Sequence, residues 1–323
     1  MRKNYEKSFI QGILDQYENL GEILEYNLFM TGFENSNFYV RTDIGEFAVK
    51  IFEGLELKPE NVSFEVEVSD YAFKQGIKVP KIYANKEGKL ETIFNEKHAI
   101  VMNYVAGENM HAKELTDSLV EQIAEEAGKM DFAFKAFQDG SKTRQSYEFD
   151  LKNVLMLEKN VEYLSEEFDR EVLQRVFEDF KRIKQEFDQL PKGLIHNDIV
   201  PHNCLVQGEK LNAIIDFSDI AFSPYVQNVA VSLHLIAFGY NWKPEQAGLF
   251  VRTYLKHNPL TEKELRLMYI LIKARFLTFV LEFNKWNFVY AFDELRAKTV
   301  KDHYEFLKRF IQFGEVEFNK LIS

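Results

Sequence analysis

The chain has 323 residues, of which 46% are hydrophobic and 28% are charged, so it can form one large globular domain or two smaller ones. Its net charge of −11 argues against a broad nucleic-acid-binding surface, because phosphate backbones require a positively charged face. The single cysteine, Cys204, cannot form an internal disulfide and is expected to be a buried small hydrophobe, which favours a reducing, cytoplasmic location. No apolar signal-peptide core and no apolar run of about 18 residues are present, so we expect no contact with a membrane.

The first hundred residues predict a β-rich region. Residues 37–43 (NFYVRTD) and 46–52 (EFAVKIF) are rich in β-branched and aromatic residues and flank a turn at residues 43–45, which predicts a hairpin. Residues 60–76 then predict a helix that ends at Gly76, and residues 81–105 predict further strands.

The remainder predicts a mainly helical region. From about residue 113 to residue 189, apolar residues recur at helical spacing. Strand-like residues 194–217 interrupt this pattern, and helices continue from about residue 224 to the end. We therefore expect an α+β protein with two domains, residues 1–105 and residues 106–323.

Residues 196–203 have the pattern H-x-D-x-x-x-x-N, and an apolar strand follows that ends in Asp216. Pro201 excludes a continuing central strand, so Asp198 should lie in a loop, where it could orient a substrate hydroxyl and accept its proton. A turn aspartate would explain this residue alone equally well. Asn203 and Asp216 carry oxygen ligands suited to Mg²⁺. The order and spacing match the catalytic and metal-binding loops of kinases, and His196 is expected to support the loop.

Lys50 lies in an apolar strand, where an unpaired ammonium would be unfavourable. We expect it to contact nucleotide phosphates and to pair with a glutamate of the next helix, although an exposed edge lysine is the alternative. Glu65 and Glu67 are both candidates, and Glu65 is favoured because Val68 and Ala72 then pack on the same side.

Two further segments are candidates for nucleotide binding. The turn before Lys50 could offer main-chain N–H groups and short polar side chains to phosphate, from Gly32, Asn35, Ser36 and Asn37. A plain hairpin turn explains these residues nearly as well. The backbone of residues 102–105, including Asn103 and Val105, could hydrogen-bond adenine.

With these residues assembled, the chain resembles the aminoglycoside phosphotransferase/choline kinase superfamily. The resemblance runs from about Asn27 to the C-terminal helices, and it looks closest to the branch of type II homoserine kinases and hydroxylysine kinases. It is carried by residues 34–52 (ENSNFYVRTDIGEFAVKIF), 75–83 (QGIKVPKIY), 100–108 (IVMNYVAGE), 195–206 (IHNDIVPHNCLV) and 214–219 (IIDFSD).

The resemblance implies a bilobal protein-kinase-like fold, with a β-rich N-lobe that binds the nucleotide and a mainly helical C-lobe. It implies ATP- and Mg²⁺-dependent transfer of the γ-phosphoryl group to a hydroxyl of a small molecule, an amino alcohol or an amino acid such as homoserine or hydroxylysine. Asp198 would be the catalytic base, Asn203 and Asp216 the Mg²⁺ ligands, and Lys50, paired with Glu65, the phosphate contact.

Other functions on the same fold stay open. One is an aminoglycoside or other antibiotic kinase, and another is a non-catalytic nucleotide-binding module. A protein kinase is disfavoured because the glycine-rich loop is missing and only a short segment separates Asp216 from Pro224.

The chain departs from the family pattern at two positions. Asn228 stands where the family usually has an aspartate that supports the catalytic loop, and Lys50 is present although type II homoserine kinases often lack it. Substrate contacts are expected in the C-terminal helices and after Asp216, where acidic groups would suit an amino alcohol or amino sugar. Each candidate has a solvated or packed role as its alternative, and the candidates are Asp219, Glu282 and Trp286.

Overall fold

The computed structural model describes residues 3–29, 35–53, 58–110, 115–290 and 292–323. The chain divides into unit 1, which comprises residues 1–107 and 212–217, and unit 2, which comprises residues 108–211 and 218–323. The sequence predicts two continuous domains with a boundary near residue 105. In the structure, the chain instead returns to unit 1 at residues 212–217, which include Asp216.

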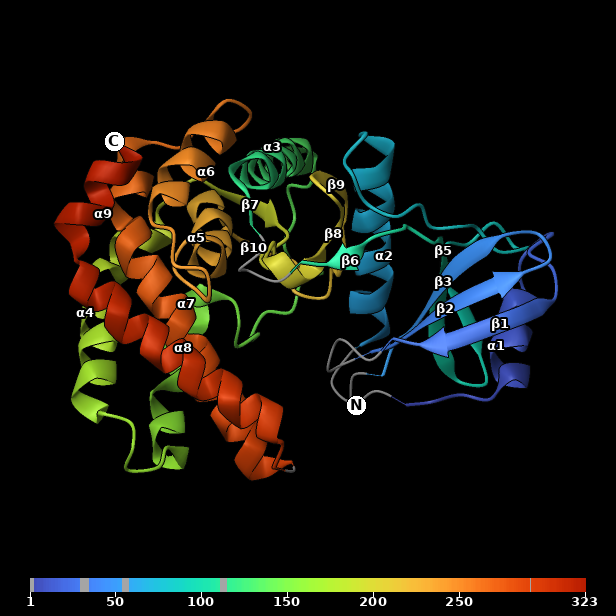
Figure 1. Cartoon of the computed structure of the whole chain (residues 1–323), viewed down its shortest axis with the longest axis horizontal. Coiled ribbons are helices and arrows are strands. Elements are labelled where there is room, and N and C mark those ends of the chain that lie inside the picture. Colours follow the sequence, from blue (N-terminus) through green and yellow to red (C-terminus); the bar gives the residue numbers. More distant parts are fainter. Residues whose placement is uncertain (1–2, 30–34, 54–57, 111–114, 291) are drawn as a thin grey trace. The chain divides into compact units, whose positions relative to one another are not determined.

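The described part of unit 1 contains a five-stranded antiparallel sheet in the order β1-β2-β3-β5-β4 (Figure 1). Its strands are β1 (Ile23–Leu28), β2 (Ser36–Thr42), β3 (Glu46–Ile51), β4 (Thr92–Phe94) and β5 (Lys97–Asn103). The predicted hairpin is formed by β2 and β3, and the Thr42 N–H closes it by donating to the Gly45 carbonyl at 2.8 Å.

Side chains alternate across β3, and this alternation decides where Lys50 points. Val49 and Ile51 are fully buried in one core cluster with Ile10 and Ile13 of α1 (Lys7–Leu14). Lys50 lies on the opposite face, next to Ile100 of β5 in the register of the sheet. Ile100 packs with Val62 and Val66 of α2 (Pro59–Lys74), so Lys50 faces α2.

The predicted helix at residues 60–76 is confirmed as α2. Pro59 occupies the first turn, where its missing N–H costs no helical hydrogen bond. The helix ends before Gly76, which adopts a φ of +79° that L-residues rarely adopt.

Unit 2 is mainly helical (Figure 1). Its α-helices are α3 (Asp117–Ala133), α4 (Arg170–Asp188), α5 (Tyr225–Ile236), α6 (Glu245–Leu255), α7 (Glu262–Val289), α8 (Glu294–Phe313) and α9 (Glu315–Ile322). The described residues of unit 2 also form the 3₁₀ helices η2 (Phe134–Ala136), η3 (Leu151–Tyr163) and η4 (Pro201–Asn203). Among the residues that the structure describes, no helix has both the length and the apolar character needed to cross a membrane.

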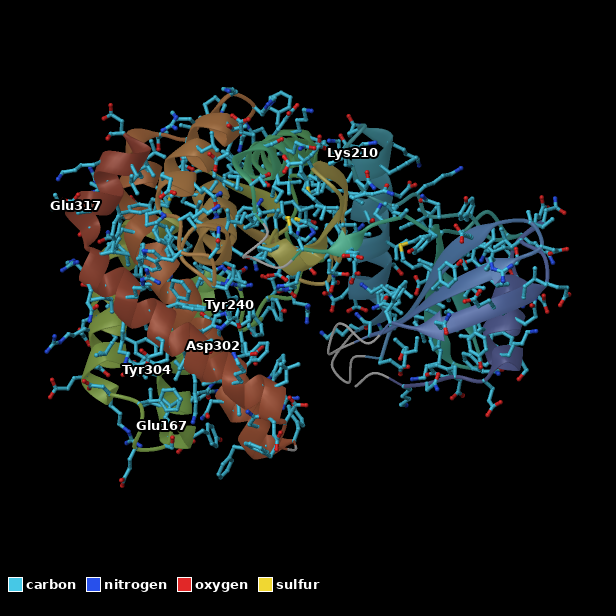
Figure 2. All side chains as sticks on the ribbon, in the orientation of Figure 1. Glu167, Lys210, Tyr240, Asp302, Tyr304 and Glu317 are labelled. Carbon is cyan, nitrogen blue, oxygen red and sulfur yellow. The ribbon has the colours of Figure 1, made fainter. Side chains whose placement is uncertain are left out.

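Helix α7 is at the centre of unit 2. Its residues from Leu267 to Phe283 are buried on all sides, which is the pattern of a helix surrounded by others. It packs against α4, α5, α8 and η3. Two tyrosine hydroxyls link helix α8 to neighbouring segments: the Tyr240 hydroxyl donates to Asp302 at 3.0 Å, and the Tyr304 hydroxyl accepts from the Asp169 N–H at 2.8 Å. Tyr240, Asp302 and Tyr304 are labelled in Figure 2.

The helical pattern predicted for residues 113–189 is wrong for residues 138–150, which form turns. Turn chemistry explains the break. The Asp139 carboxylate accepts from the Ser141 N–H at 2.8 Å, and the Thr143 N–H donates to the Gly140 carbonyl at 3.1 Å. These turns carry Arg144 and Tyr147.

Short strands hold the segments that carry the candidate site. Strand β7 (Lys192–Ile195) pairs antiparallel with β10 (Ala221–Pro224), and β6 (Glu108–Asn109) pairs antiparallel with β8 (Cys204–Gln207), which is followed by β9 (Lys210–Ile214). The H-x-D-x-x-x-x-N pattern therefore lies in the loop between β7 and β8, as expected. A β-rich unit 1 and a mainly helical unit 2 confirm the predicted α+β class.

Candidate active site

Lys50 is a buried cation between two carboxylates of unit 1. Its side-chain nitrogen Nζ lies 2.6 Å from Glu65 Oε1 and 3.2 Å from Asp216 Oδ1. Burial alone disfavours the ammonium, but the negative charges of Glu65 and Asp216 outweigh it and raise the pKa of Lys50 above its usual value. The favoured pairing with Glu65 is thus present, whereas Glu67 is exposed on the surface of α2.

Asp216 combines a strained backbone with an accessible carboxylate. Its φ is +68°, in the left-handed region that non-glycine residues seldom occupy. The preceding segment is anchored within unit 1, because the Ile214 N–H donates to the Lys78 carbonyl at 2.8 Å. The Asp216 side chain is still 43% exposed, so it can bind a divalent cation while it pairs with Lys50.

The candidate phosphate turn is held by its own polar side chains. Asn35 Oδ1 accepts from the Glu53 N–H at 3.2 Å, and Ser36 Oγ donates to Glu53 Oε1 at 3.1 Å. Asn37 lies opposite Lys50 in the β2–β3 pairing. Gly32 lies outside the described residues, and Ser36 and Asn37, which were expected in the turn, belong to strand β2, where the Asn37 carbonyl accepts from the Phe29 N–H at 2.8 Å.

The linker at the end of β5 presents main-chain groups. Asn103 is engaged with Lys81: its N–H donates to the Lys81 carbonyl at 3.0 Å, and its Oδ1 accepts from the Lys81 N–H at 2.6 Å. Among the described residues, the N–H and carbonyl of Val105 have no hydrogen-bond partner. Val105 also lines a cavity of about 550 Å³ within unit 1.

In unit 2, the Asp198 carboxylate is fixed through both of its oxygens. Oδ1 accepts from Arg275 Nη2 at 2.8 Å, and Oδ2 accepts from Asn203 Nδ2 at 2.7 Å. The Asp198 N–H donates to His196 Nδ1 at 3.3 Å, which is the supporting role expected of this histidine. A carboxylate held in this way can orient a hydroxyl with little reorganisation.

The orientation of the Asn203 amide suits a metal ligand. Its Nδ2 donates to both the main-chain carbonyl and the carboxylate of Asp198, at 3.0 and 2.7 Å. Its Oδ1 therefore points away from Asp198 and has no hydrogen-bond partner in the described part of the chain. A neutral amide oxygen beside a carboxylate is a donor set that fits Mg²⁺.

A buried chain of hydrogen bonds supports the loop before Asp198. Asn197 is fully buried with a φ of +64°, and its N–H donates to Asn228 Oδ1 at 3.0 Å. Asn228 Nδ2 then donates to both oxygens of Asp131, at 2.9 and 3.0 Å, and Tyr254 donates to the same carboxylate at 2.6 Å. Asn228 itself carries no charge. It connects the loop to the carboxylate of Asp131, which lies one hydrogen bond further from the loop than Asn228 does.

The carboxyl group of Asp131 has an unusual pKa. Burial raises this pKa to about 7, against the opposing effect of the hydrogen bonds from Tyr254 and Asn228.

Asp219, a candidate substrate residue, lies beside an arginine and a tyrosine. The Tyr147 hydroxyl donates to its carboxylate, and Arg144 Nη2 lies 3.7 Å away. Burial and then the negative charge of Asp198 raise the pKa of Asp219 to about 7, while Arg144 and Arg275 oppose this shift. Asp219 therefore shares an electrostatic environment with Asp198.

The side chains of the other two substrate candidates already contact other residues of the protein. The carboxylate of Glu282 is fully buried, accepts from Asn160 Nδ2 and lies 3.2 Å from Lys285 Nζ. Burial raises the pKa of Glu282. Trp286 is half-buried and stacks on Phe283, with the ring centres 5.1 Å apart.

Cys204 is buried, as expected. Burial and the negative charge of Asp198 raise the pKa of its thiol to about 12. A thiol of this kind stays protonated at neutral pH and is not a nucleophile.

The sequence did not indicate Arg275, Asp131, Arg144 or Tyr147. Arg275 had one available signal, since it is a charged residue inside the apolar run of residues 267–283. Charges inside such a run are almost always paired. The partner itself could not be read from the sequence, because Asp198 lies 77 residues away.

Comparison with known proteins identifies the family. The model of the phosphotransferase enzyme family (APH) matches residues 25–267, so the chain belongs to this family, and it is a small-molecule phosphotransferase. It is 23% identical to a homoserine kinase of Zymomonas mobilis, over 97% of this chain and 96% of that protein. It is 26% identical to a homoserine kinase of Methylobacillus flagellatus, over 67% of this chain and 65% of that protein.

Solved structures show the same fold. An amicoumacin kinase in complex with AMP-PNP and Ca²⁺ gives a TM-score of 0.74 at 15% identity, covering 98% of this chain and 97% of that chain. A microcompartment-associated aminopropanol kinase gives a TM-score of 0.73 at 15% identity, covering 98% of this chain and 100% of that chain. The predicted kinase-like fold is therefore confirmed.

Proposed function

We propose that this protein transfers the γ-phosphoryl group of ATP, with Mg²⁺, to a hydroxyl of a small amino alcohol or hydroxy amino acid. The observation that carries this proposal is the Asp198 carboxylate, held by Arg275 and Asn203 in the loop that follows β7. Homoserine kinases among the relatives and an aminopropanol kinase among the structural neighbours support an amino-bearing alcohol as the acceptor.

Asp198 orients the acceptor hydroxyl. The hydroxyl oxygen forms a bond to the γ-phosphorus of ATP, the bond from that phosphorus to the β–γ bridging oxygen breaks, and ADP leaves. The hydroxyl proton passes to the Asp198 carboxylate. Because such transfer needs little covalent chemistry from the protein, positioning and charge neutralisation supply most of the rate enhancement.

The remaining roles fall to residues that hold the nucleotide and the metal ion. Lys50, kept cationic by Glu65, binds the phosphates, and Asn203 and Asp216 are the Mg²⁺ ligands. Mg²⁺ neutralises the phosphate charge when bound. Asn35, Ser36 and Asn37, at the start of β2, contribute main-chain contacts to phosphate, and the linker at Asn103 and Val105 contributes main-chain contacts to adenine.

The test is ATP consumption with Mg²⁺ across a panel of amino alcohols, hydroxy amino acids and aminoglycosides. We expect turnover with at least one alcohol, and we expect Asp198→Asn to lower kcat by about 1,000-fold, because general base catalysis and orientation are lost together. Asp188→Asn, which changes a half-exposed carboxylate of α4, is the matched control and should keep full activity.

The panel also separates the alternatives. Turnover confined to aminoglycosides would indicate an antibiotic kinase. ATP binding without turnover of any alcohol, or full turnover by Asp198→Asn, would contradict the proposed phosphotransferase.

A further inference from the structure

Glu53 is a buried carboxylate of unit 1 that follows strand β3. Its side chain is only 1% exposed. Burial opposes its ionisation, but the hydrogen bonds from Lys97 and Tyr5 outweigh burial and hold the pKa of Glu53 below its usual value. An ionised carboxylate with several donors holds its neighbours firmly, because charge-assisted hydrogen bonds are stronger than neutral ones.

Segments that are far apart in the sequence meet at the Glu53 carboxylate. Oε1 accepts from the Tyr5 hydroxyl at 2.7 Å and from Ser36 Oγ at 3.1 Å. Oε2 accepts from Lys97 Nζ at 2.8 Å, and Lys3 Nζ lies 3.8 Å away. The carboxylate therefore joins the N-terminal segment, the start of β2 and the start of β5.

Side chains hold the start of β2 where the main-chain pairing stops. The pairing of β2 with β3 begins at Ser36, which lies opposite Ile51, so Asn35 and Glu53 both lie beyond it. At this point the Glu53 N–H donates to Asn35 Oδ1 at 3.2 Å. The position of Asn35 therefore depends on side-chain contacts around Glu53 rather than on the sheet.

The N-terminal segment holds the start of β2 as well. The Lys3 N–H donates to Ser36 Oγ at 2.7 Å, and the same hydroxyl donates to Glu53. The Tyr5 ring stacks on Phe9 of α1, with the ring centres 4.4 Å apart. Through Tyr5 and Glu53, the start of β2 is thus connected to the packed rings beside α1.

This network lies next to Lys50, the proposed phosphate contact. Asn37 is opposite Lys50 in the pairing of β2 with β3, so the two side chains are on the same face of the sheet. A carboxylate with an uncompensated charge would repel phosphate here. Lys97 and Lys3 place two positive charges beside Glu53, so it can hold the start of β2 without opposing the binding of phosphate.

We propose that Glu53 is a positioning residue for the phosphate site, which together with Tyr5 holds the main chain at the start of β2 in the conformation that binds the phosphates of ATP. This inference rests on the proposed function and gives the N-terminal segment a part in nucleotide binding. Glu53 acts through the residues that it holds and does not contact the nucleotide. Its loss should therefore weaken binding of the phosphates and not of the nucleoside.

The test is calorimetric binding of ATP, ADP and adenosine, with Mg²⁺ and without an acceptor alcohol. These compounds share the base and the ribose and differ in their phosphates. We expect Glu53→Ala to raise the Kd for ATP by at least about tenfold and the Kd for adenosine by less than about twofold, with ADP between them. Glu53→Gln keeps an oxygen that accepts from Tyr5 and Ser36, so it should raise the Kd for ATP by only about threefold.

Tyr5→Phe tests positioning without a change in charge. It removes the hydroxyl that donates to Glu53 and keeps the ring, and it should raise the Kd for ATP by about threefold and leave that for adenosine unchanged. The matched control is Asn85→Ala in unit 1, because Asn85 accepts from the Lys89 N–H at 3.0 Å and donates to Thr92 Oγ1 at 3.1 Å. This control should lower the melting temperature and leave the Kd values of all three compounds as in the wild type.

Melting temperatures show whether each variant is folded, and Tyr5→Phe decides the result if Glu53→Ala is not. Unchanged or tighter binding of ATP by the folded variants, or an equal loss for ATP and adenosine, would overturn the positioning role of Glu53 and leave the proposed phosphotransferase standing. A wild-type protein that binds no ATP would overturn both.

Discussion

At the scale of single residues, Lys50 shows how a charge is kept in an apolar sheet. The Lys50 residue is only 6% exposed, and its ammonium is stabilised by Glu65 and Asp216, which hold it in the protonated form that phosphate binding requires. The same contacts make it part of the stability of unit 1, because removing one member of a buried ion pair leaves the other charge uncompensated.

Lys50→Met should therefore damage both stability and activity. We expect unit 1 to lose about 3 kcal/mol of stability, since Glu65 is left buried without its ammonium, and we expect the KM for ATP to rise by at least about tenfold. Thermal unfolding and steady-state kinetics measure the two effects. Lys89→Met, which changes a mostly exposed lysine of unit 1 that pairs with an equally exposed glutamate, is the control.

The double variant Lys50→Met with Glu65→Leu separates the two effects. It removes both charges, so it should recover most of the lost stability but not the affinity for ATP. Recovery of ATP affinity in this double variant would show that Lys50 has only a structural role.

The sequence was informative where a pattern is local. Lys50 and Glu65 could be paired in advance because the two-residue period of β3 and the helical period of α2 each assign a face. Arg275, Asp131 and Arg144 could not be found, because their residue types are common on exposed helices and turns. Their roles come from partners more than 70 residues away.

At the scale of elements, three helices meet at one carboxylate. Asp131 belongs to α3, Asn228 to α5 and Tyr254 to α6, and their hydrogen bonds reach the main chain of Asn197, the residue before Asp198. Asp131 is therefore a positioning residue for the loop between β7 and η4.

Exchanging the two side chains tests this role. Asn228→Asp alone places two carboxylates together in a buried position, so it should lower both the melting temperature and kcat, the latter by at least about tenfold. The double variant Asp131→Asn with Asn228→Asp again has one carboxylate and one amide at these two positions. It should therefore recover much of the melting temperature and much of kcat. The KM for ATP should change little throughout. A double variant no better than Asn228→Asp would contradict the positioning role.

The raised pKa of Asp131 predicts a pH dependence of stability. An aspartate in the unfolded chain has a pKa of about 4, whereas that of Asp131 in the folded protein is about 7. Between these values the folded protein binds the extra proton, so this group makes the wild-type protein less stable as pH rises through the window and has no further effect above it.

Asp131→Asn lacks this titration. Its melting temperature, relative to wild type, should therefore rise as pH increases from about 4 to about 7 and then level off. Asp219 is present in both proteins, so its contribution cancels. Calorimetry over this pH range measures the difference, and a constant difference would contradict the raised pKa of Asp131.

Elements whose turns and ends have clear sequence signals were predicted correctly, and elements that lack such signals were not. The β2–β3 hairpin and α2 have clear turns and ends, and both are confirmed. The turns of residues 138–150 were assigned to a helix because long apolar periodicity on both sides outweighed the short Asp139–Gly140–Ser141 signal.

At the scale of the whole molecule, the residues assigned to the proposed chemistry are divided between the two units. Unit 1 carries Lys50, Glu65 and Asp216, and unit 2 carries Asp198 and Asn203. The return of residues 212–217 to unit 1 could not be predicted, because it depends on contacts distant in sequence, such as that between Ile214 and Lys78. Family resemblance supplied the class of fold, whereas the long-range contacts had to come from the structure.

The central claim is that this protein moves a phosphoryl group to an alcohol through Asp198. Phosphorus NMR of a reaction with Mg²⁺, ATP and the best alcohol of the panel tests it most directly. We predict that the γ-phosphate signal is replaced in equal amount by a phosphomonoester, and that chelation of Mg²⁺ or Asp198→Asn abolishes this product. Release of inorganic phosphate without a phosphomonoester, or unchanged product formation by Asp198→Asn, would contradict the claim.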